Sequence, residues 1–210
     1  MASSDKKSKN LCKFIGEKEI AHGNWLALKE ITYSDPNGKE RKWESVSRVV
    51  NQKMSQQAVA VIAILKCTLK FDCIILVRQY RPPLQTCTIE FPAGLVDVNE
   101  SPSEAAIREL KEETGFTGIL KHKSPVVGLD PGASNNVVTL VTVEIDGDDP
   151  HNQSPKPKLE PTEFIETKIV QLCNLLLQLN EFAEDGDIID SRVYSYAIAL
   201  EQTKKKGAIV

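Results

Sequence analysis

The sequence predicts a mixed α/β sandwich with a small antiparallel β unit at its N-terminus. Two patterns carry this prediction. Between residues 53 and 202, short apolar runs typical of buried strands are interspersed with segments of helical periodicity. Residues 14–52, by contrast, show only strand patterns separated by turn signals. A chain of 210 residues is long enough to bury one core and to carry a small appendage.

The N-terminal β unit, residues 14–52, follows a polar, lysine-bearing tail at residues 1–13. Turns are predicted at residues 22–24 and 35–38, which contain glycine, asparagine and proline. Three antiparallel strands are only marginally stable alone, so we expect this unit to pack on another surface.

The second domain, residues 53–202, is expected to contain several strands and helices. The strand patterns cover residues 58–65, 73–77, 86–90, 137–145 and 164–170. The two C-terminal helical patterns cover residues 172–182 and 188–204. Residues 146–162 include four prolines and are predicted to form a long surface loop, a feature that is often functional. Residues 203–210 are expected to form a loose tail.

A further helix is predicted between Pro102 and Thr114. Ser101 is suited to cap its N-terminus, proline is favoured at the first helical position, and Glu104 completes a capping box. Gly115 is a typical residue for the C-terminal stop. The side expected to face a core carries Ala106, Ile107, Leu110 and Thr114.

An acidic arc lies on the same predicted helix. Glu109, Glu112 and Glu113 fall within about a third of its circumference, at ~100° per residue. Arg108 is placed to pair with Glu112 one turn on, which leaves the other two carboxylates for a divalent metal. Ligands that are all oxygen favour Mg²⁺ or Mn²⁺. The alternative is an ordinary amphipathic helix with a solvated acidic face.

Composition excludes several classes of function. The net charge of −3 argues against a general polyanion binder such as a nucleic-acid-binding protein. Residues 1–10 lack the apolar core of a signal peptide, and the apolar run at residues 58–65 is too short to span a membrane. The five cysteines are odd in number and scattered, so we expect reduced thiols. A cytoplasmic or nuclear enzyme fits these features.

The stretch from Gly94 to Phe116 reads GLVDVNESPSEAAIRELKEETGF. It matches the pattern G-x5-E-x7-R-E-U-x-E-E-x-G-U, in which U is a bulky apolar residue, and therefore resembles the signature of the Nudix hydrolases. The resemblance implies the Nudix-fold α/β/α sandwich with a mixed sheet, and a phosphate-bearing substrate with Mg²⁺ or Mn²⁺ as the cofactor.

The similarity extends beyond this motif to the ADP-sugar pyrophosphatase branch, and among its members to the animal ADP-ribose pyrophosphatases. The segments that carry it are Trp25, residues 42–46, Arg48, residues 79–83, 90–94, 130–132 and 192–196. This branch also has a proline about sixteen residues after the last motif glycine, where this chain has Pro131.

The resemblance implies a role for each matching residue of the metal site. Glu109 and Glu113, with the carbonyl of Ala93, would bind the metal. Glu100 and Glu112 would bind a further metal or orient these ligands. Glu163 matches a loop glutamate that would act as general base, and its neighbours Glu160 and Glu166 remain alternatives.

The same resemblance implies the substrate contacts. The matching residues are Trp25, Trp43, Glu44, Arg48, Arg81, Leu95 and Asp130. The two tryptophans would sandwich the adenine from opposite subunits of a homodimer with swapped N-terminal units. Glu44 and Arg48 would contact the nucleoside end, Arg81 the diphosphate, and Leu95 and Asp130 the terminal ribose. Each has a simpler reading: the tryptophans as core residues, the arginines as surface charges, and Asp130 as a turn former.

The leading hypothesis is therefore Mg²⁺-dependent hydrolysis of ADP-ribose and related ADP-sugars to AMP and a sugar phosphate, with water attacking the adenosine-side phosphorus. Two alternatives are hydrolysis of oxidised nucleotides such as 8-oxo-dGDP and a catalytically silent nucleotide-binding module. The second is disfavoured because every motif carboxylate is present.

Overall fold

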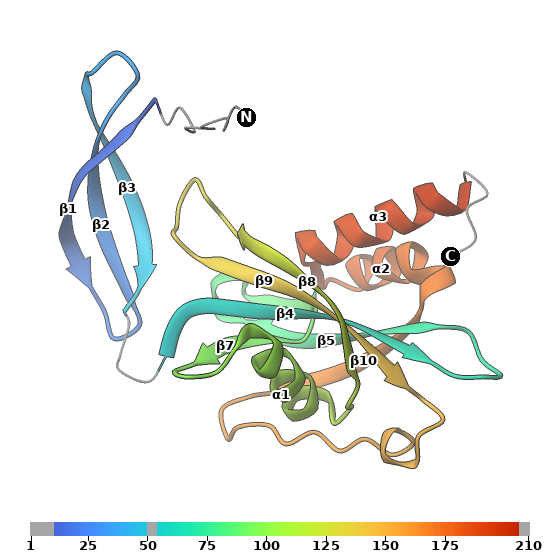
Figure 1. Cartoon of the computed structure of the whole chain (residues 1–210). Coiled ribbons are helices and arrows are strands. Elements are labelled where there is room, and N and C mark those ends of the chain that lie inside the picture. The colour runs from blue at the N-terminus through green and yellow to red at the C-terminus, as the bar shows by residue number, and fades with distance from the viewer. Residues whose placement is uncertain (1–10, 50–53, 206–210) are drawn as a thin grey trace, which may run out of the picture. The chain divides into compact units, whose positions relative to one another are not determined.

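The computed structural model describes residues 11–49 and 54–205, and it divides into two units (Figure 1). The first unit combines residues 1–52 with residues 128–137, and the second combines residues 53–127 with residues 138–210. Residues 128–137 fall within the predicted second domain, whereas their contacts group them with the first unit. They form the loop between two strands of the second unit, and their hydrogen bonds to the first unit assign them there.

The first unit is built on a three-stranded antiparallel sheet of β1 (Lys13–His22), β2 (Leu26–Ser34) and β3 (Glu40–Arg48), in that order. Both predicted turns connect these strands. Gly38 has a φ of 78°, a conformation that glycine adopts without strain. The Asp35 carboxylate accepts the backbone amides of Asn37 and Lys39, which closes the second turn.

The second unit contains a sheet of eight strands. Its main order is β11-β6-β5-β4-β9-β8, with β10 paired to β5 and β7 paired to β4. The strands are β4 (Met54–Lys66), β5 (Cys73–Arg81), β6 (Thr86–Glu90), β7 (Ala93–Asp97), β8 (Ile119–Gly128), β9 (Val137–Asp146), β10 (Ile165–Gln171) and β11 (Ile188–Ile189). The β11–β6 pair is parallel and the β5–β6 pair is antiparallel, so the sheet is mixed.

Helices cover both faces of this sheet. Helix α1 (Pro102–Thr114) lies on one face, whereas α2 (Leu175–Glu184) and α3 (Ser191–Lys205) lie on the other (Figure 1). Alternate residues of β4 follow this division, because Val59 and Val61 pack in the α1 core and Ala60 packs in the α2–α3 core. The predicted α/β/α sandwich with a mixed sheet is confirmed.

Three strands have no counterpart in the sequence prediction. β8 is an edge strand with mostly exposed side chains, so it lacks the apolar run of a buried strand. β7 contains Gly94 and follows Pro92, two residues typical of loops, so the sequence indicates a loop at this position. β11 has only two residues. Helix α3 also extends to Lys205, three residues into the predicted tail.

Within the described residues, no helix is long and apolar enough to cross a membrane. The five cysteines are all free.

Candidate active site

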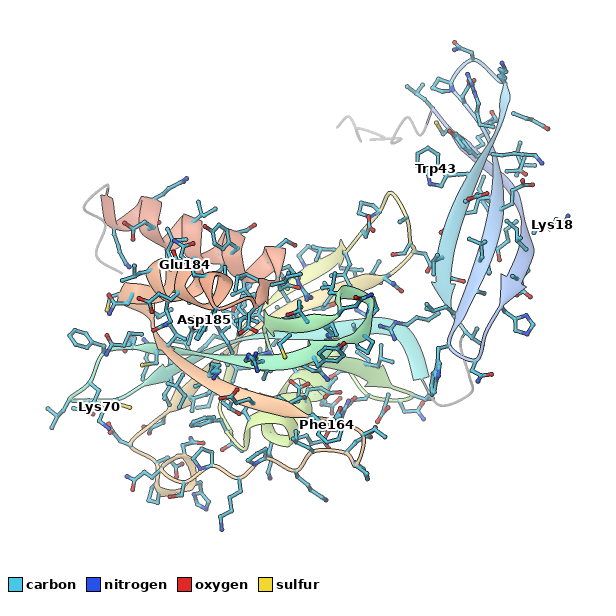
Figure 2. The ribbon with its side chains drawn as sticks, turned by 180° about the vertical axis from the view of Figure 1, so that it is seen from behind. Lys18, Trp43, Lys70, Phe164, Glu184 and Asp185 are labelled. Atoms are coloured by element: carbon cyan, nitrogen blue, oxygen red, sulfur yellow. The ribbon has the colours of Figure 1, made fainter. Side chains whose placement is uncertain are left out.

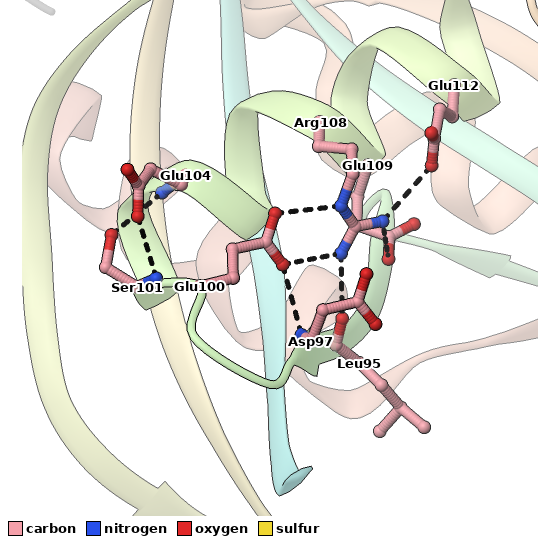
Figure 3. Close-up of polar contacts among 8 residues, drawn as sticks. All are labelled: Leu95, Asp97, Glu100, Ser101, Glu104, Arg108, Glu109 and Glu112. Atoms are coloured by element: carbon pink, nitrogen blue, oxygen red, sulfur yellow. Dashed lines mark hydrogen bonds and ion pairs between the residues drawn. The ribbon is translucent and has the colours of Figure 1, made fainter. Parts of the chain in front are cut away.

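Helix α1 carries the acidic residues, and its ends are fixed as its sequence predicts. The Ser101 hydroxyl accepts the amide of Glu104, and the Glu104 carboxylate accepts the amide of Ser101, which forms a complete capping box (Figure 3). Gly115 ends the helix in the left-handed conformation, with its amide donating to the Lys111 carbonyl. Ala106 and Leu110 are fully buried and hold α1 on the sheet.

Glu109 lies directly against the backbone of β7. A Cβ atom added to Gly94 would come within 1.9 Å of Glu109 Oε1, so this approach requires glycine. Burial raises the pKa of Glu109, the Arg108 guanidinium opposes this, and Glu112 and Glu163 add to the rise. Negative charge is thus concentrated next to the Gly94 backbone, which has no side chain in the way.

Glu113 is the more deeply buried of the two carboxylates, at 5% exposure. Its Oε2 accepts the amide of Ala93 at 3.0 Å. Burial raises the pKa of Glu113 to about 8; the Ala93 amide lowers it, the charges of Glu109 and Glu163 raise it further, and Arg81 opposes them. A cation placed here would relieve a desolvated and mutually repelling pair of carboxylates.

Arg108 organises the other carboxylates of the motif (Figure 3). It binds both oxygens of Glu100 at 2.9 Å through Nε and Nη2, and its Nη2 also donates to the Leu95 carbonyl. Its Nη1 donates to Glu109 at 2.8 Å and to Glu112 at 3.1 Å. The predicted pairing of Arg108 with Glu112 is confirmed, but the expectation that Glu109 is left free is wrong, because the five guanidinium donors reach several partners at once.

Glu163 lies at the end of the long loop, close enough to the α1 carboxylates to raise the pKa of both Glu109 and Glu113. Its own carboxylate accepts the Glu160 amide at 3.0 Å, and its amide donates to the Glu160 carbonyl. Of the three glutamates considered in this region, Glu163 is the one whose charge acts on the α1 carboxylates. Glu166 instead binds Lys168 at 2.5 Å.

The loop that carries Glu163 is attached to the rest of its unit. Asn152 is buried and donates to the carbonyls of Thr117 and Asp146. Lys158 donates its amide to the Glu112 carbonyl at 2.7 Å, which joins the loop to helix α1.

Arg81 ends β5 ahead of the 3₁₀ turn Pro82–Leu84. Its Nε and Nη2 form a bidentate pair with Glu90 at 2.7 and 2.8 Å, and the Thr88 hydroxyl donates to the same carboxylate. Burial acts to raise the pKa of Glu90, but these two hydrogen bonds and the Arg81 charge hold it below its ordinary value. The bidentate pair with Glu90 fixes the guanidinium of Arg81. Among the described residues no acceptor binds its Nη1, which can donate to a further group.

Arg81 and Glu90 also line a cavity of about 410 Å³ with Leu84, Ile188 and Ile189. The importance of Glu90 is not apparent from sequence reasoning, although the residue belongs to the 90–94 segment that carries the family resemblance. The β5–β6 register pairs Arg81 with Thr86 and Glu90 with Val77, so strand pairing gives no direct signal for this contact.

The α1 site fits a hard divalent cation. Glu113 accepts the Ala93 amide and Glu109 lies against Gly94, so both carboxylates of α1 bring oxygen atoms to the same stretch of β7 backbone. In the described part of the chain, no three acidic, histidine or cysteine side chains already form a metal-binding group. The pair of carboxylates suits Mg²⁺, which usually takes one or two carboxylates and completes its shell with water and substrate phosphate.

The remaining predicted substrate residues lie in the first unit. Trp25 is 75% exposed and Trp43 is 51% exposed, so neither is a core residue of the described chain. Glu44 and Arg48 are exposed on β3. The backbone carbonyl of Asp130 accepts the amides of Ala133 and Ser134, so this residue does form a turn.

Comparison with known proteins places the chain in a family. Residues 54–191, about two thirds of the chain, match the family model described as NUDIX domain. An ADP-sugar pyrophosphatase from Mus musculus is 44% identical over 191 residues, which is 90% of this chain and 88% of that protein. An ADP-ribose pyrophosphatase from Saccharomyces cerevisiae is 41% identical over 189 residues, which is 90% of this chain and 82% of that protein.

A solved structure supports the same fold. The crystal structure of an ADP compounds hydrolase superposes with a TM-score of 0.61 and covers 94% of this chain and 97% of its own, at 22% identity. The sandwich with helices on both faces of its sheet is thus a known fold, and the chain belongs to the NUDIX domain family.

Proposed function

We propose that this protein is a Mg²⁺-dependent hydrolase that cleaves the diphosphate of ADP-ribose and related ADP-sugars. The products would be AMP and a sugar phosphate, which is ribose 5-phosphate when the substrate is ADP-ribose. The names of the mouse and yeast relatives support this substrate class. The observation that carries the proposal is the buried carboxylate pair of Glu109 and Glu113, whose raised pKa values mark a site that needs a cation.

Glu109, Glu113 and the Ala93 carbonyl would hold Mg²⁺, and the bound ion would neutralise the charge that develops on the diphosphate. Glu100 and Glu112 would support this set through Arg108, which they share with Glu109. Arg81 would contact a phosphate oxygen with the Nη1 donors that Glu90 leaves free.

Glu163 is the proposed general base. It would accept a proton from the water that attacks the adenosine-side phosphorus, while the bond from that phosphorus to the bridging oxygen breaks and the sugar phosphate leaves. The charge of Glu163 acts on the α1 carboxylates, which supports this proposed role. Leu95 would line the terminal ribose from β7, and Asp130 would contact the same sugar.

The adenine clamp would require two chains. Trp43 pairs with Ile31 in the β2–β3 register, six residues beyond Trp25. The two tryptophans of one chain are therefore about 20 Å apart along the sheet, at ~3.4 Å per residue. Two rings that sandwich a base must lie about 7 Å apart, and side chains stand roughly perpendicular to a sheet. One chain cannot close such a clamp with these strands, which favours a homodimer with exchanged N-terminal units.

The exposed apolar residues of the first unit support the same dimer. They include Phe14 at 67%, Ile20 at 49% and Leu26 at 51% exposure. A partner subunit that covered them would supply the burial that a three-stranded sheet lacks on its own. Glu44 and Arg48 would then contact the nucleoside beside the clamp.

The test is a panel of nucleotides incubated with Mg²⁺, including ADP-ribose, ADP-mannose and 8-oxo-dGDP, with chromatographic separation of the products. We expect ADP-ribose to yield AMP and ribose 5-phosphate, and hydrolysis in ¹⁸O-water to place the label in AMP. Glu109→Gln and Glu113→Gln should each lower kcat by about two orders of magnitude or more, because each removes charge from the cation site. Label in ribose 5-phosphate would reverse the attack, and a preference for 8-oxo-dGDP would replace the substrate class.

Glu163→Gln should reduce kcat far more than KM, because it removes a proton acceptor and keeps the shape of the side chain. Glu166→Gln is the matched control, since that carboxylate is exposed and pairs with Lys168. Full activity of Glu163→Gln would assign the base to another group.

A further inference from the structure

The loop between β8 and β9 leaves its own sheet and joins the first unit. Residues 128–137 group with residues 1–52 rather than with the strands on either side. The Val46 amide donates to the Ala133 carbonyl at 2.8 Å, and Val46 forms a parallel bridge with Ser134. The loop therefore adds a short segment to the free edge of β3.

The same loop contacts the indole of Trp43. Nε1 of Trp43 donates to the Gly132 carbonyl at 2.9 Å, while the ring remains half exposed. Figure 2 shows the side chain of Trp43 projecting from its strand. Within the described residues, the indole of Trp25 has no such bond and is three-quarters exposed. The two tryptophans thus differ in how firmly their rings are held.

We propose that the β8–β9 loop is a positioning element for Trp43, with the Gly132 carbonyl fixing the plane of the indole before a nucleotide binds. The ring keeps one face available for stacking and loses the rotamer freedom that binding would otherwise have to remove. This inference deepens the proposed adenine clamp and rests on it for its consequence in nucleotide binding. Its structural part, the restraint of the ring, stands without it.

The shape of the loop explains why it can hold a ring. The Asp130 carbonyl accepts the amides of both Ala133 and Ser134, at 3.1 and 2.9 Å, which closes a tight turn around Pro131 and Gly132. Proline fixes its own φ and so narrows the conformations of the turn. The Gly132 carbonyl, which accepts the indole hydrogen bond, therefore lies in a stiff turn. We assign to Pro131 the role of stiffening this turn.

Fluorescence tests the restraint without any substrate. The chain has two tryptophans, so Trp25→Phe leaves Trp43 as the single reporter and Trp43→Phe leaves Trp25. In time-resolved anisotropy, Trp43 should show a smaller nanosecond depolarisation than Trp25. Adding Pro131→Gly should increase the depolarisation of Trp43 and leave that of Trp25 unchanged. Equal mobility of the two rings, or no response of Trp43 to Pro131→Gly, would overturn the proposal.

Calorimetric titration with AMP tests the consequence for binding. Both Trp→Phe changes remove similar ring area, but only Trp43→Phe removes a hydrogen bond, so its loss of affinity should be about twofold to tenfold larger. Pro131→Gly should weaken AMP binding in the parent protein and have little further effect when combined with Trp43→Phe.

The anisotropy and the AMP titration together distinguish the restraint of Trp43 from the proposed adenine clamp. If AMP does not bind the parent protein while the anisotropy results hold, the proposed clamp fails and the restraint of Trp43 survives. If AMP binds but equal losses follow from the two Trp→Phe changes, or the effects of Pro131→Gly and Trp43→Phe add fully, the loop does not act through the indole.

Discussion

Glu113 places a carboxylate where a neutral group would be more stable. It is buried, it has a single amide donor on Ala93, and it faces the charges of Glu109 and Glu163. Desolvation of the charged form dominates, and the pKa rises from the ordinary 4.5 to about 8. Such an arrangement destabilises the fold and favours cation binding. A bound cation would replace the favourable interaction with water that the charged carboxylate loses on burial.

Glu113→Gln should therefore stabilise the protein in EDTA at alkaline pH while abolishing activity. Between about pH 4.5 and 8 the folded protein retains a proton that the unfolded chain has released, so wild-type stability falls as pH rises through this window. At ~1.4 kcal/mol per pKa unit the gain from the substitution has an upper bound of about 5 kcal/mol at pH 8 and vanishes below pH 4.5. Thermal unfolding across this pH range measures it.

Glu112→Gln is the control for this experiment, because that side chain is 45% exposed and lies outside the buried pair. We expect it to change the Tm little at any pH. A Glu113→Gln protein that is less stable than wild type at pH 8 in EDTA would contradict the assigned burial cost.

Gly94 offers a second change at the scale of one residue. In Gly94→Ala the new methyl group would overlap the Glu109 carboxyl, with its nearest atom 1.9 Å away, so that the flexible end of Glu109 must swing aside. Since only a side-chain tip moves, we expect a small change in Tm and a loss of kcat of about 100-fold or more. Retained activity would mean that Glu109 does not act from its observed position.

Among the elements, helix α1 and the long loop are joined at two points. The Glu112 carbonyl accepts the Lys158 amide, and the backbone around Lys156 lies against Gly115. The sequence predicts a long surface loop at residues 146–162, and the described contacts attach it to its unit as far as residue 158. Movement that brings Glu163 to a substrate is thereby confined to the short stretch that follows.

Gly115→Ala should be strongly destabilising. The residue has a φ of 79°, and a Cβ atom would lie 2.3 Å from the Lys156 amide nitrogen. Strain in the left-handed conformation and a clash with backbone should together cost about 2 kcal/mol or more. Gly186→Ala is the matched control, because Gly186 has a φ of 98° with nothing within 4 Å of the added atom. We expect about 1 kcal/mol there, by urea unfolding followed by circular dichroism. Equal costs at the two glycines would contradict the contact between helix and loop.

The success of the sequence prediction varies among the elements for physical reasons. Helix α1 is predictable to the residue because Ser101, Pro102, Glu104 and Gly115 supply local signals at both ends. β6 is also predicted with its observed bounds. β8 escapes prediction because an edge strand with mostly exposed side chains carries no apolar run that would mark it as a strand.

At the scale of the whole molecule, some parts of the candidate site can be predicted from the sequence and others cannot. The metal-site residues are predictable because they follow one motif on one helix and the strand before it. Two other contacts cannot be predicted from the sequence because they depend on tertiary structure. They are the pairing of Arg81 with Glu90 and the hydrogen bond from Trp43 to Gly132. The separation of Trp25 from Trp43 likewise follows from strand register, which the sequence alone leaves open.

Mixing two variants that each bind adenine nucleotides weakly tests the proposed dimer. Trp25→Ala and Trp43→Ala should each weaken adenine-nucleotide binding by about 1–3 kcal/mol. If the clamp takes one ring from each chain, a mixed dimer contains one clamp with both tryptophans. Random exchange of subunits should then restore about a quarter of the wild-type sites.

Titration of the mixture with AMP measures this recovery, and light scattering establishes the subunit number. No recovery after verified exchange would show that both rings act from the same chain. A monomer with full activity would exclude the dimer altogether.

The loop at residues 128–137 also bears on how the protein is made. Trp43 and its acceptor on Gly132 are 89 residues apart in the chain. At a synthesis rate of about 5–20 residues per second, the ribosome delivers the acceptor some 4 to 18 s after the tryptophan. During that interval β3 presents an unpaired edge beside exposed apolar side chains. During these seconds, chaperones or a neighbouring chain on the same message can compete for the nascent N-terminal sheet.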